Sequence, residues 1–163
     1  MKSKYGESVF MNMKIVLQKV KHASVMVEGE TVGEIDHGLL LFLGITHDDT
    51  RAQADYLAEK VLKLRIFSDT QDTFMEKNVV DVSGSILIVS QFTLYGECQK
   101  GTRPSFIRAA KPDVAEPLYH YFCDALRERG GTVATGQFGA YMKVTIVNDG
   151  PITLVLEKGS SSV

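Results

Sequence analysis

The sequence lacks the motifs of several common catalytic and binding sites. Its four histidines, His22, His37, His47 and His120, lie in different segments without the spacing of metal ligands. The absence of a G-x-S-x-G motif argues against the serine nucleophile of an α/β-hydrolase, and no glycine-rich phosphate motif follows an expected strand. We therefore expect no metal and no cofactor, and any hydrolysis must depend on backbone groups, hydroxyl groups or the substrate itself.

Cysteine, long apolar runs and excess charge are also scarce. Two cysteines, Cys98 and Cys123, indicate reduced thiols in a cytoplasmic protein rather than a disulfide framework. The apolar run from Leu39 to Leu43 is far shorter than the about 20 residues that span a bilayer, so we expect no membrane partner. A net charge of −2 weakens the case for nucleic-acid binding but leaves room for a protein that holds only the end of an RNA with a few local cations.

The 163 residues are enough for one domain with a sizeable core. Residues 1–12 are polar and aperiodic and lack the apolar middle of a signal peptide, so we expect a disordered extension or a mis-assigned start. The domain itself is expected to cover residues 13–158, and residues 159–163 to form a flexible tail.

The order of the expected elements predicts the fold class. Apolar residues at steps of three and four predict a helix at 50–64, and a second helix, at 113–129, should end at Gly130-Gly131. Strands are expected at 15–20, 23–27, 31–35, 39–45, 86–89, 132–135, 142–147 and 152–157. This order predicts an α/β domain with a mostly antiparallel or mixed, barrel-like sheet and two main helices, and it disfavours a Rossmann arrangement.

The segment Ser90-Gln91-Phe92-Thr93-Leu94 is the first candidate site. It ends a buried strand, where hydroxyl and amide side chains can line a pocket on a rigid scaffold. Backbone N–H groups at this strand end, without a further partner strand, could point at a developing oxyanion. An ordinary edge strand with Ser and Thr in its ladder explains the same residues equally well.

The segment from Lys100 to Lys111 is the second candidate. Its cations, Lys100, Arg103, Arg108 and Lys111, are not accompanied by any acidic residue, so they can neutralise phosphates locally. The alternative is a solvated charged loop, which is what most charge runs are.

The segment Asn148-Asp149-Gly150-Pro151-Ile152-Thr153 is the third. A Gly-Pro bond can be cis at a cost of about 0.5–1 kcal/mol, and a cis bond fixes the direction of the adjacent carbonyls. On spacing alone, a hairpin turn between two strands is the better interpretation.

Together these segments resemble the D-aminoacyl-tRNA deacylase family, of the D-tyrosyl-tRNA deacylase type. The resemblance begins at Met13-Lys14-Ile15-Val16-Leu17-Gln18 and continues to about Leu156. Four motifs occur in the family's order and spacing: S-Q-F-T at 90–93, the connecting segment at 100–110, Phe138-Gly139-Ala140 with Met142, and N-x-G-P-x-T at 148–153.

The resemblance implies an activity and an assembly. Family members hydrolyse the ester between a D-amino acid and tRNA, spare L-aminoacyl-tRNA, and also remove glycine from mischarged tRNA, which is proofreading in translation. Their Gly-Pro peptide is cis and reaches into the active site of the neighbouring subunit, so the resemblance implies a homodimer with active sites at the subunit interface.

The resemblance also assigns residues. Ser90, Gln91, Phe92 and Thr93 correspond to the catalytic pocket, with Thr93 either a nucleophile or secondary to backbone groups and the terminal ribose hydroxyl. For substrate binding, Gly150 and Pro151 correspond to the chiral selector, Thr153 completes their motif, and Met142 is expected to touch the terminal adenosine. Because of their charge, and independently of the resemblance, Lys100, Arg103, Arg108 and Lys111 are expected to contact tRNA phosphates.

Lys19 departs from the family pattern, because many members have arginine there. A lysine offers a point charge in place of a planar fork, so the Gly-Pro loop is expected to be less firmly held if this position supports it.

Two other functions remain as alternatives. One is a non-catalytic module that binds the tRNA end through the Lys100–Lys111 segment. The other is a broad esterase or peptidase with a Thr or Cys nucleophile, which is disfavoured because no histidine-partnered nucleophile is recognisable.

Overall fold

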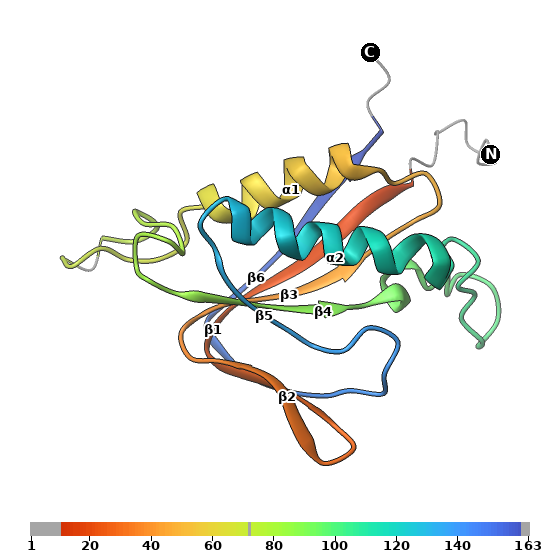
Figure 1. Ribbon diagram of the computed structural model, residues 1–163, viewed down its shortest axis with the longest axis horizontal. Helices are drawn as coiled ribbons and strands as arrows, with labels where there is room; N and C mark the ends of the chain where they lie inside the picture. The colour runs from red at the N-terminus through yellow and green to blue at the C-terminus, as the bar shows by residue number, and fades with distance from the viewer. Residues whose placement is uncertain (1–10, 72, 161–163) are drawn as a thin grey trace.

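The computed structural model describes residues 11–71 and 73–160, and these form six strands, two α-helices and one 3-10 helix (Figure 1). In chain order they are β1 (Asn12–Val27), β2 (Glu30–Ile35), β3 (Gly38–Gly44), α1 (Arg51–Lys63), β4 (Ser85–Ser90), η1 (Phe92–Tyr95), α2 (Pro112–Glu128), β5 (Thr132–Thr135) and β6 (Lys143–Gly159). The expected extension over 1–12 and tail over 159–163 lie mostly outside these residues, although Asn12 opens β1 and Gly159 closes β6.

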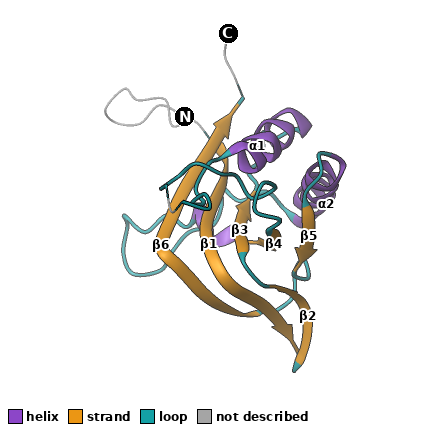
Figure 2. Ribbon diagram, turned by 90° about the vertical axis from the view of Figure 1, so that its left-hand side faces the viewer, coloured by secondary structure: helices purple, strands orange, loops and turns teal. Residues whose placement is uncertain are grey.

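The six strands form one mixed sheet in the order β2-β1-β3-β4-β5, with β6 paired to β1. Pairing is antiparallel between β1 and each of β2, β3 and β6, and parallel from β3 to β4 and from β4 to β5. The sheet curls until β2 approaches β5 (Figure 2), and Gly33 of β2 lies so near the backbone of Thr135 that a Cβ atom would overlap it. The expectation of a mixed, barrel-like sheet with two main helices is confirmed.

The hairpin expected around Asn148–Pro151 is wrong. Residues 143–148 and 153–159 pair with the same strand, β1, as one long strand, and the register shifts between Gln18 and Val20 and again between Val20 and His22. Residues 149–152, which include Gly150 and Pro151, therefore form a bulge opposite Lys19 instead of a reversal of the chain. A bulge and a turn need the same permissive residues, so the local sequence alone does not separate them.

The two helices pack side by side on one face of the sheet (Figure 1). The apolar stripe of α1, with Leu57 and Val61 fully buried, meets the stripe of α2, with Phe122 and Leu126 fully buried. This is the packing that the three- and four-residue spacing predicts. In the described part of the chain, neither helix is long and apolar enough to cross a membrane.

The turn between β3 and α1 ends in a capping box. The side chain of Thr50 accepts a hydrogen bond from the N–H of Ala52 at 3.3 Å, and the side chain of Gln53 accepts one from the N–H of Thr50 at 2.8 Å. These contacts satisfy donors that the first turn of a helix leaves without a backbone partner, and so they fix where α1 begins.

The same turn buries the carboxyl group of Asp49, which accepts a hydrogen bond from the N–H of Thr46 at 2.7 Å. Burial raises the pKa of Asp49 to about 6; the charge of Asp48 adds to the rise, and the N–H groups of Thr46 and Met13 oppose it. The buried phenol of Tyr95 is close enough for the charge of Asp49 to raise its pKa further. The ionised form of Asp49 is thus less stable in the folded protein than in the unfolded chain.

We expect Asp49→Asn to remove a pH dependence of stability. Because the folded-state pKa is raised, the wild-type free energy of unfolding should fall as pH rises from about 4 through about 6, on the order of 3 kcal/mol in total relative to the variant. Urea unfolding of both proteins between pH 4 and 8 measures this difference. The exposed Asp48→Asn is the control, which should keep most of the dependence. Parallel profiles for wild type and Asp49→Asn would contradict the prediction.

Candidate active site

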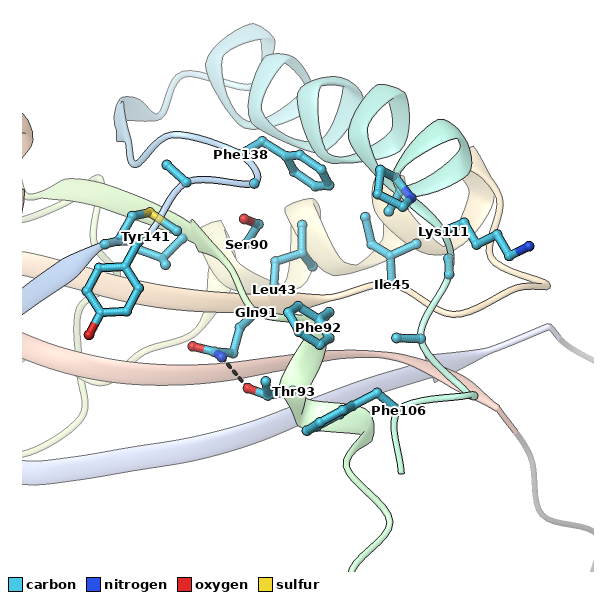
Figure 3. Close-up of a pocket in the computed structure, with 18 of the residues that line it drawn as sticks. Leu43, Ile45, Ser90, Gln91, Phe92, Thr93, Phe106, Lys111, Phe138 and Tyr141 are labelled. Atoms are coloured by element: carbon cyan, nitrogen blue, oxygen red, sulfur yellow. Dashed lines mark hydrogen bonds between the residues drawn. The ribbon is translucent and has the colours of Figure 1, made fainter. Parts of the chain in front are cut away.

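One pocket of about 800 Å³ opens where β3 and β4 end (Figure 3). Four segments surround it: the end of β4 with η1, the end of β3, residues 106–112 before and into α2, and residues 138–142 before β6. Its walls are mostly apolar. Ser90, Gln91, Phe92 and Thr93 all line this pocket, together with Met142 and Lys111, so the structure brings together residues from three of the sequence motifs.

The S-Q-F-T segment leaves the sheet at this point. Ser90 still pairs with Leu43 of β3, and the N–H of Gln91 donates to the carbonyl of Leu43 at 2.8 Å. The chain then turns into η1, where the N–H of Leu94 donates to the carbonyl of Gln91 at 3.3 Å. The N–H groups of Phe92 and Thr93 precede that first bond, so the turn itself gives them no acceptor.

The Thr93 hydroxyl accepts a hydrogen bond from the side-chain amide of Gln91 (Figure 3). Among the described residues, the pocket lining contains no histidine, aspartate, glutamate or cysteine. Thr93 is therefore held in place by a donor and has no protein base beside it to remove its proton. This arrangement differs from an activated nucleophile, in which a base contacts the nucleophile and a third group orients the base.

Aromatic side chains stand at the mouth of the pocket. Phe92 and Phe106 meet edge to face with ring centroids 5.3 Å apart, and both are exposed. Tyr141, 87% exposed, projects from the opposite side (Figure 3), and Phe138 packs against Tyr119 of α2. Exposed aromatic faces of this kind suit stacking on a flat ring, such as a nucleic-acid base.

The predicted phosphate-binding cations are spread over a longer surface. Lys111 lines the pocket and is the one residue with a formal charge among the described residues that do so. Arg108 lies 3.8 Å from Glu97, which neutralises part of its charge. Lys100 and Arg103 are exposed on the preceding loop and do not reach the pocket.

Gly150 and Pro151 lie apart from the pocket of their own chain. Both are exposed in the bulge of β6, they are joined by a cis peptide bond, and Gly150 has a φ of 128°. At that φ a side chain would be strained, and a Cβ atom would lie 2.8 Å from the side chain of Ile152. The structure thus separates the two halves of the expected site within one chain.

Side chains from β1 and β6 brace the bulge. The amide of Asn148 donates to the carbonyls of Lys19 and Ile152, each at 3.0 Å. Lys19 lies 3.7 Å from the carboxylate of Asp149, which Lys21 approaches at 4.0 Å. Lys19 therefore does contact the Gly-Pro segment, as a charge partner of Asp149.

The hydroxyl of Thr153, at the end of the N-x-G-P-x-T motif, also forms a hydrogen bond. It accepts a hydrogen bond from the side-chain amide of Gln18 at 3.2 Å, across the pairing of β6 with β1. Its neighbours are thus strand residues, and it does not line the pocket.

Sequence reasoning missed part of the site. Phe106, Ala109, Phe138 and Tyr141 line the pocket, and none was expected as a site residue. Phe106, Ala109 and Phe138 belong to the quoted motifs, which was the available signal. Their convergence requires that residues 106–109, before α2, and residues 138–141, after β5, reach the same edge of the sheet, which is a long-range property.

Comparison with known proteins finds relatives that share one description, deacylases of D-aminoacyl-tRNA. Residues 16–157 match the family described as D-Tyr-tRNA(Tyr) deacylase. A D-aminoacyl-tRNA deacylase of Exiguobacterium sibiricum is 57% identical over 146 residues, which cover 90% of this chain and 100% of that protein. One of Halalkalibacterium halodurans is 58% identical over 145 residues, covering 89% of this chain and 99% of that protein.

Two solved structures share the fold. A protein named c-Myc DNA Unwinding Element Binding Protein superposes with a TM-score of 0.85 at 41% identity, covering 91% of this chain and 100% of that one. A second, described as a probable eukaryotic D-amino acid tRNA deacylase, has a TM-score of 0.76 at 19% identity and covers 90% of this chain and 100% of that one. At that identity the second likeness concerns the fold alone.

Proposed function

Since this chain belongs to the D-Tyr-tRNA(Tyr) deacylase family, we propose that it removes D-amino acids and glycine from the 3′ end of tRNA and leaves L-aminoacyl-tRNA intact. The general activity, hydrolysis of the D-aminoacyl-tRNA ester, follows from membership of the family. The observation that supports the proposal is the pocket at the S-Q-F-T turn, which offers aromatic faces and the backbone of that turn but, among the described residues, no histidine, carboxylate or thiol.

Hydrolysis of this ester does not need a strong protein base. Water adds to the carbonyl carbon, the bond to the ribose oxygen breaks, and that oxygen leaves with a proton. We assign the N–H groups of Phe92 and Thr93 as donors to the oxyanion, an effect worth about 2.7–4 kcal/mol per donor in other enzymes. The neighbouring ribose hydroxyl, supplied by the substrate, positions the water or shares its proton.

Selection between mirror images requires contacts with atoms that every amino acid has. We assign this task to the main-chain carbonyls beside Gly150 and Pro151, which accept hydrogen bonds from the α-ammonium in one orientation. An L side chain would then collide with the backbone, whereas glycine has no side chain to collide. Exposure of both residues, and the side chains that brace the bulge, support this assignment.

The separation of the two halves supports the proposal of a homodimer. Gly150 and Pro151 do not line the pocket of their own chain, so we infer that they enter the pocket of a second copy, which makes the site complete only at the subunit interface. Among the described strands, β6 pairs with β1 alone, and it carries exposed apolar residues such as Val147 and Val155, a surface suited to such contact.

A small set of residues is proposed to contact the tRNA part of the substrate. Lys111 at the rim can hold a phosphate of the tRNA end, with Arg108, Arg103 and Lys100 further along the acceptor stem. Met142 and the aromatic mouth can hold the terminal adenosine. Because the substrate is aminoacylated tRNA, the enzyme is expected to act in the cytoplasm.

The decisive experiment compares D-tyrosyl-, L-tyrosyl- and glycyl-tRNA. We expect rapid release of D-tyrosine and glycine and an L-tyrosine release no faster than that without enzyme. A module that only binds nucleic acid would leave all three esters intact. Turnover of a small chromogenic ester without tRNA would instead indicate a broad esterase.

Variants of Thr93 separate the two mechanisms. With the backbone mechanism, Thr93→Ala should retain most activity on D-tyrosyl-tRNA, because the N–H donors remain. Loss of nearly all activity in Thr93→Ala together with retention in Thr93→Ser would show that the hydroxyl is the nucleophile. Single-turnover rates at saturating enzyme make the comparison independent of substrate affinity.

Mixing two inactive variants tests the shared site. Gly150→Val should damage the selector through its positive φ, and Ser90→Leu should fill the pocket. Each variant alone should be inactive. After unfolding and refolding together in equal amounts, about a quarter of wild-type activity should return, since half of the dimers are mixed and each holds one intact site. Sites built within one chain would give no recovery.

A further inference from the structure

One wall of the pocket is an irregular segment, residues 106–111, which we call the strap and which meets η1 through the ring contact of Phe106 with Phe92. It lies between the loop of Lys100 and helix α2, and it belongs to no helix or strand. Phe106, Ala109, Ala110 and Lys111 of the strap all face the pocket. Its internal backbone hydrogen bond, from the N–H of Ala109 to the carbonyl of Phe106 at 3.0 Å, makes a single turn. A segment with so little structure of its own depends on its neighbours for its position.

The turn after β3 supplies those contacts. The hydroxyl of Thr46 donates to the carbonyl of Arg108 at 2.6 Å, and the strap forms an antiparallel bridge between Ala109 and Thr46. The N–H of Ala110 donates to the carbonyl of Ile45 at 2.9 Å, and a ring nitrogen of His47 lies 2.7 Å from the carbonyl of Ile107.

Thr46 is the buried centre of this set. Its side chain is completely inaccessible to solvent, whereas His47 is exposed. Its own N–H is held by the carboxylate of Asp49, so the residue is fixed on one side by the turn and holds the strap on the other. Hydrogen bonds between buried groups are costly to leave unmade, about 1–3 kcal/mol for each unsatisfied group.

We propose that Thr46 is a positioning residue for the deacylase reaction: its hydroxyl sets the place of the strap, and through it the wall against which the substrate binds. This inference rests on the proposed function. It adds that two tasks, the chemistry and the positioning of the substrate, belong to different segments. The groups assigned to the chemistry lie on β4 and η1, and the hydrogen bond from the N–H of Gln91 to the carbonyl of Leu43 fixes them without Thr46. The strap meets η1 through the side-chain rings of Phe106 and Phe92 and leaves that backbone bond unchanged. The strap fixes the substrate.

Thr46→Val tests the proposal, because it keeps the shape of the side chain and removes the donor. We expect KM for D-tyrosyl-tRNA to rise about fivefold to tenfold with kcat changed less than about twofold, as for the loss of one binding contact. Thr46→Ser restores the hydroxyl and should return KM to near the wild-type value. In the free protein, the N–H of Ala110 should exchange with solvent about tenfold faster in Thr46→Val than in wild type.

Val61→Ala is the matched control for loss of stability. Val61 is fully buried in α1 among the helix contacts and does not line the pocket. If Val61→Ala raises KM as much as Thr46→Val does, or if Thr46→Ser fails to restore KM, the proposal is overturned. Unchanged exchange at Ala110 in Thr46→Val overturns it as well.

The exchange measurement needs no substrate. Should the wild-type protein prove inactive on D-aminoacyl-tRNA, the proposed function would fail, and the exchange at Ala110 would still decide whether Thr46 holds the strap. The two failures are therefore distinguishable.

Discussion

The parallel pairing of β3 with β4 is the constraint on which the site depends. It places Leu43 level with Ser90, so that both strands end at the same edge of the sheet. Beyond that edge the chains diverge, one into the turn before α1 and the other into η1. Ligands of α/β proteins commonly bind where neighbouring parallel strands end and their chains separate. The pocket lies at that place, and the turn that carries the proposed backbone donors is anchored by the hydrogen bond from the N–H of Gln91 to the carbonyl of Leu43.

The two halves of the proposed site are rigid for different reasons. The S-Q-F-T turn is held in place by the buried strand that precedes it, in which Ile86 to Val89 are almost inaccessible to solvent. The Gly-Pro bulge is exposed and has no core around it, so side chains must brace it, namely Asn148 on two carbonyls and Lys19 on Asp149. A surface that discriminates by collision has to be stiff, because a backbone that moves aside would admit the wrong enantiomer.

Local patterns in the sequence predicted the features that depend on neighbouring residues, such as the two helices. The helices expected at 50–64 and 113–129 correspond to Arg51–Lys63 and Pro112–Glu128, because the spacing of buried residues follows the helical period. The pairing of β6 with β1 escaped prediction, since residues 143–159 meet residues 12–26 and no local signal encodes that contact. The S-Q-F-T segment was identified as a site because its signal is local. Tyr141 was not, because the loop after β5 brings it to the pocket through contacts that are distant in the sequence.

The sequence has few catalytic motifs and the pocket has little charge, and one physical reason explains both observations. An ester already activated for transfer needs an oriented donor more than a strong base, and dipoles act most strongly in a site that is apolar and shielded from water. A carboxylate beside the oxyanion would oppose the developing charge, and a lysine deep in the pocket would lose much of its hydration. Lys111, at the exposed rim, avoids both costs, in keeping with its proposed contact with a tRNA phosphate. A net charge of −2 is therefore compatible with the proposed action on an RNA end, because Lys111 is the one formally charged residue among the described residues that line the proposed site.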